Sequence, residues 1–159
     1  MTASAASTKT EPIWFIDNLA RVHIDAASTH GAFSVVELAG RQGDMPPLHV
    51  HRREDEGFYV LDGRLSLFIG RETRELSAGE AVLAPRDIPH IYRVESESAR
   101  WLALCAPAGF EQFIREAGKP ADADELPPDD RPHDPARLAE IAARYGVEIL
   151  GPPGALPTS

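Results

Sequence analysis

Two histidines separated by a single residue, His49 and His51, limit what this chain can fold into more than any other feature. On a β-strand, residues two positions apart point to the same face, so the two imidazoles would lie side by side. Glu56 follows on the next predicted strand, and His90 opens a later one. An antiparallel barrel can bring such strands together. We therefore expect His49, His51, Glu56 and His90 to converge on one metal ion inside a small barrel.

Short segments rich in β-forming residues follow one another over most of the chain. The strongest turn signal between them is Asp62-Gly63, which is typical of a β-hairpin. Residues 26–31 are predicted to form a loop, and residues 71–76 an edge strand or the flank of a turn. The other predicted strands cover residues 12–17, 20–25, 32–40, 48–52, 56–61, 64–69, 79–85, 90–95 and 100–106. Many short strands with frequent turns indicate an all-β sandwich or barrel.

The hydrophobic pattern changes to a helical one near the C-terminus. Residues 110–117 place apolar side chains on one helix face, and residues 135–145 do so again after an Asp-Pro start signal. Both helices are predicted to pack outside the barrel. The acidic, proline-rich segment 119–133 between them is either a solvated connector or a lid over the barrel mouth. The predicted organisation is a disordered tail (1–10), a barrel (11–107) and a helical extension of the same domain (108–159).

Charge and cysteine content exclude several classes of protein. The net charge is −9, whereas nucleic acids and anionic membranes are bound by basic surfaces. The single cysteine, Cys105, cannot form an internal disulfide, and it lies in an apolar run typical of a buried residue. The sequence contains no signal peptide and no apolar run long enough to cross a bilayer. These features predict a cytoplasmic protein that binds neither nucleic acid nor membrane.

The spacing of these residues resembles the two motifs of the cupin superfamily. The first motif, G-x5-H-x-H-x3-4-E-x6-G, matches at every position. The second, G-x5-P-x-G-x2-H-x3-N, matches except that Asp87 replaces the second glycine and Val94 the asparagine. Neither departure affects a metal ligand. The matching residues are Gly43, His49, His51, Glu56 and Gly63 in the first motif, and Gly79, Pro85 and His90 in the second.

The resemblance implies a double-stranded β-helix, the jelly-roll barrel of cupins, which is often dimeric through its outer strands. It also implies one divalent transition metal per chain, held by the three histidines and Glu56, with one or two coordination positions open for chemistry. Nitrogen and oxygen ligands without thiolate suit Fe, Mn, Co or Ni, with Zn as a further candidate. The alternative is a metal-free, hydrogen-bonded cluster. We expect a homodimer.

Among cupins of one domain, the chain looks most similar to quercetin 2,3-dioxygenases. That resemblance implies an enzyme that cleaves a flavonol, or a related small aromatic substrate, with O2. Glu56 would then be both a metal ligand and the general base that takes the proton of the substrate hydroxyl. Two alternatives stay open: a non-oxidative, metal-dependent isomerase or cyclase acting on a polyketide or sugar, and a cupin that binds a small molecule without catalysis.

Aromatic residues on the predicted strands are candidates for the substrate pocket. Tyr92 shares a face with His90, so we expect it to lie nearest the metal. Each candidate taken singly also fits an ordinary barrel core. The candidates are Phe33, Phe58, Phe68, Tyr92 and Trp101.

Overall fold

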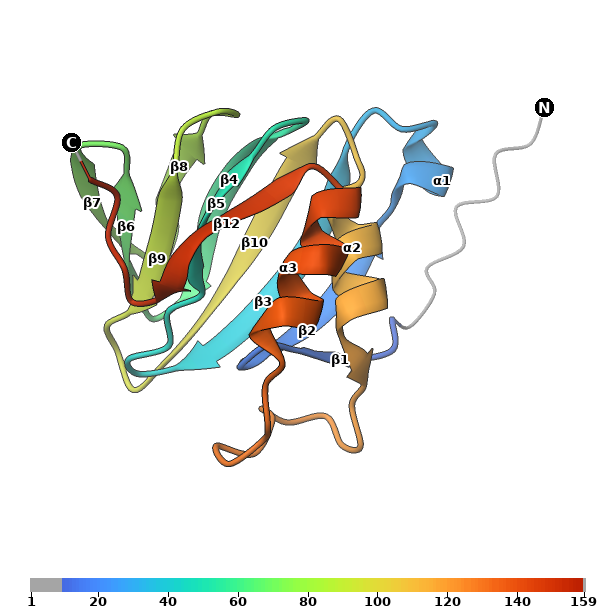
Figure 1. Cartoon of the computed structure of the whole chain (residues 1–159). Helices are drawn as coiled ribbons and strands as arrows, with labels where there is room; N and C mark the ends of the chain where they lie inside the picture. The colour runs from blue at the N-terminus through green and yellow to red at the C-terminus, as the bar shows by residue number, and fades with distance from the viewer. Residues whose placement is uncertain (1–9, 159) are drawn as a thin grey trace.

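Two antiparallel β-sheets form most of the molecule, which is described here by a computed structural model of residues 10–158 (Figure 1). The tail predicted to be disordered lies outside the described residues, except for residue 10. The first sheet contains β1 (Ile13–Phe15), β2 (Asn18–Ile24), β3 (Ser34–Arg41), β5 (Asp55–Asp62), β8 (Ala81–Ala84), β10 (Ser98–Ala106) and β11 (Lys119–Pro120). The second contains β4 (Pro47–His51), β6 (Arg64–Ile69), β7 (Glu72–Ser77), β9 (His90–Val94) and β12 (Val147–Pro153).

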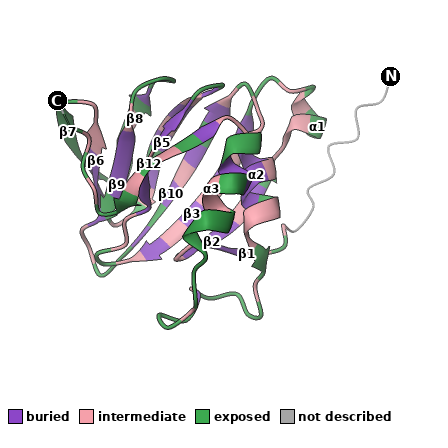
Figure 2. Cartoon of the chain, in the orientation of Figure 1, coloured by how far each residue is buried: buried purple, intermediate pink, exposed green. Residues whose placement is uncertain are grey.

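The strand orders are β11-β1-β2-β3-β10-β5-β8 in the seven-stranded sheet and β12-β4-β9-β6-β7 in the five-stranded sheet. Apolar side chains alternate inward along the long strands, as in the buried–intermediate pattern of β3. Figure 2 shows these buried positions along strands such as β9 and β10. The predicted all-β, jelly-roll fold is confirmed. Strand β7 is an edge strand.

The turn at Asp62-Gly63 does not make the hairpin that the sequence predicted. Strand β5 pairs with β8 and β10, whereas β6 pairs with β7 and β9 in the other sheet. Gly63 has a φ of 77°, and a Cβ there would lie 2.4 Å from the Ser98 carbonyl oxygen. The sequence therefore encodes a tight turn, but this turn passes the chain from one sheet to the other.

Two further segments differ from the sequence prediction. The predicted loop at residues 26–31 contains a short helix, α1 (Ala26–Thr29), because the Asp25 carboxylate caps it by accepting a hydrogen bond from Ser28 N at 3.1 Å. Residues beyond the last helix form β12, which pairs with β4 and so completes the second sheet. Strand β12 follows a helix, and its partner lies about a hundred residues earlier in the chain, so local patterns did not reveal it.

The two C-terminal helices, α2 (Phe110–Ala117) and α3 (Pro135–Arg144), lie side by side at one end of the barrel (Figure 1). Phe113 packs edge-on against Phe15, with ring centroids 5.3 Å apart. The segment between the helices is held along the N-terminal strands, where Trp14 Nε1 donates to the Glu125 carbonyl at 2.8 Å. Arg41 donates to the Pro127 carbonyl at 2.7 Å. Within residues 10–158, no helix is long and apolar enough to span a bilayer.

Candidate metal centre

Three strands bring the four predicted ligands together. His49 and His51 lie on β4, Glu56 near the start of β5, and His90 at the start of β9, directly across from His49. One ligand atom from each residue lies within 4.8 Å of those of the other three, so the cluster could hold a metal ion. His51, Glu56 and His90 are buried, and His49 is half-buried. The pairing of β4 with β9 brings the three histidines together, and Glu56 reaches them from β5 of the other sheet.

Each histidine is oriented through its Nδ1 atom. His49 Nδ1 lies 2.8 Å from the Pro47 carbonyl oxygen, and His90 Nδ1 lies 3.1 Å from the carbonyl oxygen two residues before it. A carbonyl only accepts hydrogen bonds, so both Nδ1 atoms carry the proton and donate. In the neutral imidazole the Nε2 atoms are then unprotonated and face the centre. This is the tautomer that metal-bound histidines require.

The third histidine is held by a carboxylate instead of a carbonyl. His51 Nδ1 lies 2.5 Å from Glu54 Oε1, and Glu54 is only 2% exposed. Metal-ligating histidines are often held in this way, because the carboxylate fixes the ring and makes its other nitrogen a stronger ligand. Sequence reasoning did not identify Glu54 as part of the site. The only signal was a carboxylate three residues after a candidate ligand.

The atoms that face one another at the centre need a cation between them. Glu56 Oε2 lies 2.9 Å from His90 Nε2 and 3.1 Å from His51 Nε2. With its proton on Nδ1, the neutral His90 ring presents an acceptor nitrogen to an acceptor oxygen. His51 Nε2 is buried, and its angle to Glu56 Oε2 does not make a hydrogen bond, so this nitrogen has no hydrogen-bond partner among the described residues. Two nitrogens and a carboxylate arranged in this way fit a metal ion or a shared proton.

The charges within the cluster are strongly coupled. Burial, followed by repulsion from His90 and His51, lowers the pKa of His49 to about 3. Burial also acts to lower the pKa of His51, but Glu56 and Glu54 outweigh it and raise that pKa to about 9. Burial acts to raise the pKa of Glu56, but His51 and His90 outweigh it and keep that pKa well below its ordinary value. The Glu56 carboxylate is therefore ionised at neutral pH.

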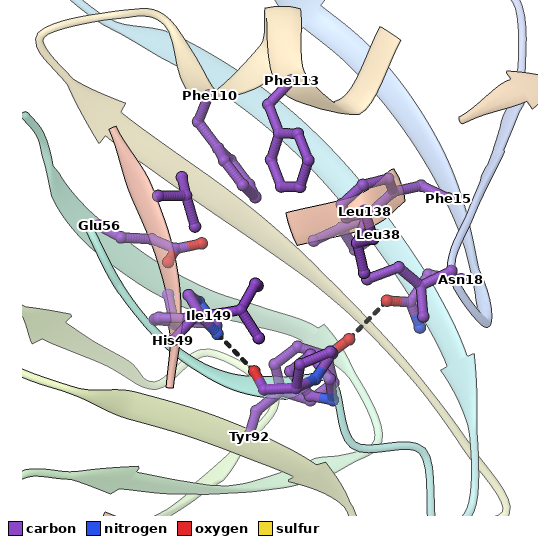
Figure 3. Close-up of a pocket in the computed structure, with 15 residues that line it drawn as sticks. Phe15, Asn18, Leu38, His49, Glu56, Tyr92, Phe110, Phe113, Leu138 and Ile149 are labelled. Carbon is purple, nitrogen blue, oxygen red and sulfur yellow. Dashed lines mark hydrogen bonds between the residues drawn. The ribbon is translucent and has the colours of Figure 1, made fainter. Parts of the chain in front are cut away.

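An apolar cavity opens beside the cluster and is reached by His49 and Glu56 (Figure 3). About 40 Å³ of it is open to the centres of water molecules, which is room for a few waters. The wall combines both sheets with the two C-terminal helices. Its residues are Phe15, Ile16, Asn18, Leu38, Pro46, Pro47, His49, Glu56, Phe58, Tyr92, Phe110, Phe113, Leu138, Val147 and Ile149.

Two of the five predicted pocket aromatics, Phe58 and Tyr92, line this cavity. The other three do not. Trp101 is fully buried behind Tyr92, with ring centroids 4.8 Å apart. The Arg93 guanidinium lies over the ring of Phe68, 5.5 Å from the ring centroid. Phe33 precedes β3 and is 37% exposed.

Sequence reasoning missed the helical wall, which Phe110, Phe113 and Leu138 provide. The apolar periodicity of residues 110–117 and 135–145 identified these faces, but not the cavity behind them. Segment 119–133 contributes no residue to the lining.

The match to known proteins agrees with this geometry. The family model described as the cupin domain matches residues 35–105, which contain all four clustered residues. Residues 35–105 therefore form a cupin domain. The resemblance stated from the sequence motifs is thereby confirmed.

Relatives extend the likeness to quercetin dioxygenases. The chain is 36% identical to a quercetin 2,3-dioxygenase of Bacillus subtilis over 110 residues, which cover 69% of this chain and 33% of that protein. It is 24% identical to a quercetin 2,3-dioxygenase of Aspergillus japonicus, over 63% of this chain and 31% of that one. The chain thus spans about a third of the length of these curated relatives.

Solved structures show the same fold. The polyketide cyclase RemF of Streptomyces resistomycificus superposes with a TM-score of 0.54 at 22% identity, over 79% of this chain and 89% of that one. At this level of identity the likeness concerns the fold alone.

Proposed function

We propose that this protein is a metal-dependent dioxygenase that cleaves a flavonol or a related aromatic compound with O2. The observation that carries the proposal is the position of the cluster. Two of its residues, His49 and Glu56, line an otherwise largely apolar cavity, whereas His51 and His90 do not. A ligand in the cavity would meet the centre from one side only. The sequence likeness to two quercetin 2,3-dioxygenases supports the choice of substrate class.

His49, His51, Glu56 and His90 are the proposed ligands of one divalent metal ion. Three imidazole nitrogens and one carboxylate, without thiolate, suit Fe, Mn, Co or Ni, and Zn is a further candidate. When bound, such an ion supplies Lewis acidity and a template for orienting a substrate oxygen. The acceptor atoms that face one another at the centre support a cation at this place.

Glu56 is the proposed general base. Its carboxylate is ionised and so free to accept a proton, although in the metal-free protein His51 and His90 hold its pKa below the ordinary value and thereby make it a weaker base. It also lines the cavity, so it can meet a substrate hydroxyl there and accept its proton. The apolar walls would exclude water from this step and would suit both an aromatic ring and O2.

A flavonol is larger than the space now open beside the cluster. Ligand pockets for molecules of that size span roughly 300–1,000 Å³. The strands of the two sheets are tied by backbone hydrogen bonds, whereas α2 packs against them through side chains, such as Phe113 on Phe15. Movement of the helical wall is therefore the proposed way in which the substrate is admitted.

Oxygen uptake with quercetin tests the proposal, using protein loaded in turn with Mn, Fe, Co and Ni. Uptake with at least one metal, accompanied by release of carbon monoxide, is the expected result. Glu56→Gln is the matched control and should lose uptake. Absence of uptake with all four metals would reject quercetin as the substrate and favour a different dioxygenase substrate or an oxygen-independent isomerase or cyclase. The expected homodimer stays a prediction, for which light scattering on the purified protein is the measurement.

A further inference from the structure

The cavity has a second polar point besides the metal cluster. Its lining is otherwise apolar, apart from Asn18, the first residue of β2, and Tyr92 in the middle of β9. Asn18 is 3% exposed and Tyr92 is 7% exposed, so both side chains are more than nine-tenths buried. They belong to different sheets, and their hydrogen bond joins the two sheets across the barrel. Figure 3 shows this pair set apart from Glu56 on the cavity wall.

The hydrogen bonds of this pair are incomplete. The Tyr92 hydroxyl donates to Asn18 Oδ1. Asn18 Nδ2, a group with two N–H donors, is buried and has no partner among the described residues. The Tyr92 oxygen still has a lone pair that can accept. Buried polar groups are nearly always paired in folded proteins, so an unpaired amide in a cavity wall calls for an explanation.

The backbone beside the amide leaves space for it. A Cβ on Gly40 would lie 2.9 Å from Asn18 Nδ2 and 2.9 Å from Asp44 Oδ2, so glycine is required for the amide to sit where it does. The carboxylate oxygen Asp44 Oδ2 already accepts a hydrogen bond from Arg41 N at 2.8 Å. The alternative is a structural role, in which Asn18 only supports the turn at residues 40–44. A test must distinguish this role from substrate binding.

We infer that Asn18 and Tyr92 form the subsite for a hydroxyl group at the end of the substrate remote from its metal-binding oxygens. A phenolic hydroxyl matches both free positions, because it can accept from Asn18 Nδ2 and donate to the Tyr92 oxygen. A carbonyl oxygen would use only the amide. The inference rests on the proposed function for the choice of a flavonol, and it adds that polyhydroxylated flavonols are preferred over those that carry only the metal-binding group.

Binding without turnover tests the subsite. Quercetin and 3-hydroxyflavone share the 3-hydroxyl and 4-carbonyl groups, but 3-hydroxyflavone lacks the other hydroxyls. Both are titrated anaerobically against metal-loaded protein and followed by fluorescence. The wild type should bind quercetin about tenfold more tightly, the factor expected for one hydrogen bond of ordinary strength. Asn18→Leu and Tyr92→Phe should each reduce that preference by weakening quercetin binding alone.

Ser34→Ala is the matched control. Ser34 also buries an oxygen that has no partner among residues 10–158, but it lies outside the cavity lining. This variant should keep the wild-type preference, and metal content by elemental analysis should be the same in all four proteins. Because Tyr92→Phe keeps the ring and removes one oxygen, it serves if Asn18→Leu fails to fold.

The outcomes test the subsite independently of the proposed dioxygenase reaction. Equal affinities of the wild type for both flavonols, or an equal loss of both in the variants, would overturn the inference and leave Asn18 a structural residue. Failure of quercetin to bind the wild type would overturn it as well. A preference that depends on Asn18, found in protein that takes up no oxygen, would support the subsite while rejecting quercetin dioxygenase activity.

Discussion

Glu54→Gln should weaken metal binding about tenfold, because the buried Glu54 carboxylate holds His51 by a hydrogen bond of 2.5 Å. A hydrogen bond to a charged group contributes about 1.5–3 kcal/mol and a neutral one about 0.5–1.5 kcal/mol. Gln keeps the acceptor oxygen but loses the charge, so the difference is about 1–1.5 kcal/mol, or roughly tenfold in affinity. Glu54→Ala removes the whole bond and should cost up to about 100-fold, as is usual for carboxylates behind metal-bound histidines.

Competition with a chelator, using Co or Zn, measures this loss, and the pH of the assay matters. In the metal-free protein the pKa of His51 is raised to about 9, so at pH 7 the metal must displace a proton from it. Removing the Glu54 charge lowers that pKa and eases the displacement, which partly offsets the loss. At pH 9.5, above that pKa, most of the wild-type protein has already lost this proton. The difference between Glu54→Gln and wild type should therefore be larger at pH 9.5 than at pH 7.

Asp55→Asn provides the matched control. Asp55 is the neighbouring residue, but its carboxylate pairs with Arg86 at 3.2 Å near the surface, away from the cluster. This variant should bind metal like the wild type at both pH values. If Glu54→Gln and Glu54→Ala also retain wild-type affinity at pH 9.5, Glu54 does not support the metal ligand His51, and the reasoning fails.

Three further predictions address the cluster and the helical wall. Replacing His49 or His51 by Ala should remove most bound metal by elemental analysis, and near-full occupancy would refute their assignment as ligands. Glu56→Gln should reduce turnover far more than metal content, because the amide is a poor base; equal loss of both would make Glu56 a ligand only. Phe113→Ala should lower the free energy of unfolding by about 3–5 kcal/mol in a denaturant titration, because it empties a buried site packed against Phe15. A change under about 1 kcal/mol would show that the wall collapses around the gap.

The sequence predicted the fold class and the four clustered residues because these depend on local patterns. The alternation of His49 and His51 fixes their common face, and short strands with turn signals identify an all-β fold. Strand partners are not local. The Asp62-Gly63 pair encodes a turn with positive φ, but the choice between a hairpin and a change of sheet is made by β8, β9 and β10. The pairing of β12 with β4 was missed for the same reason.

The substrate side of the site was harder to predict, because its residues come from elements far apart in the chain. Asn18 meets Tyr92 only after the two sheets have packed face to face. The sequence did not show which aromatic residues on strands point into the cavity, because each strand has one face inside the barrel and one face outside. Tyr92 therefore reaches the cavity, while Phe68 of the neighbouring strand packs against Arg93.

Strands position the metal cluster, and helices form the far wall of the cavity. The clustered residues His49, His51, Glu56 and His90 all sit on strands, where ladder hydrogen bonds fix their positions. The far wall of the cavity belongs to α2 and α3, which are held to the barrel by side-chain packing and by the segment between them. Phe110 of α2 contacts the cluster, since its ring lies edge-on to His51 with centroids 4.9 Å apart. The rest of this wall can move without disturbing the cluster. Metal retention should therefore respond to substitutions in the cluster itself, and substrate fit to substitutions in the helical wall and at Asn18 and Tyr92.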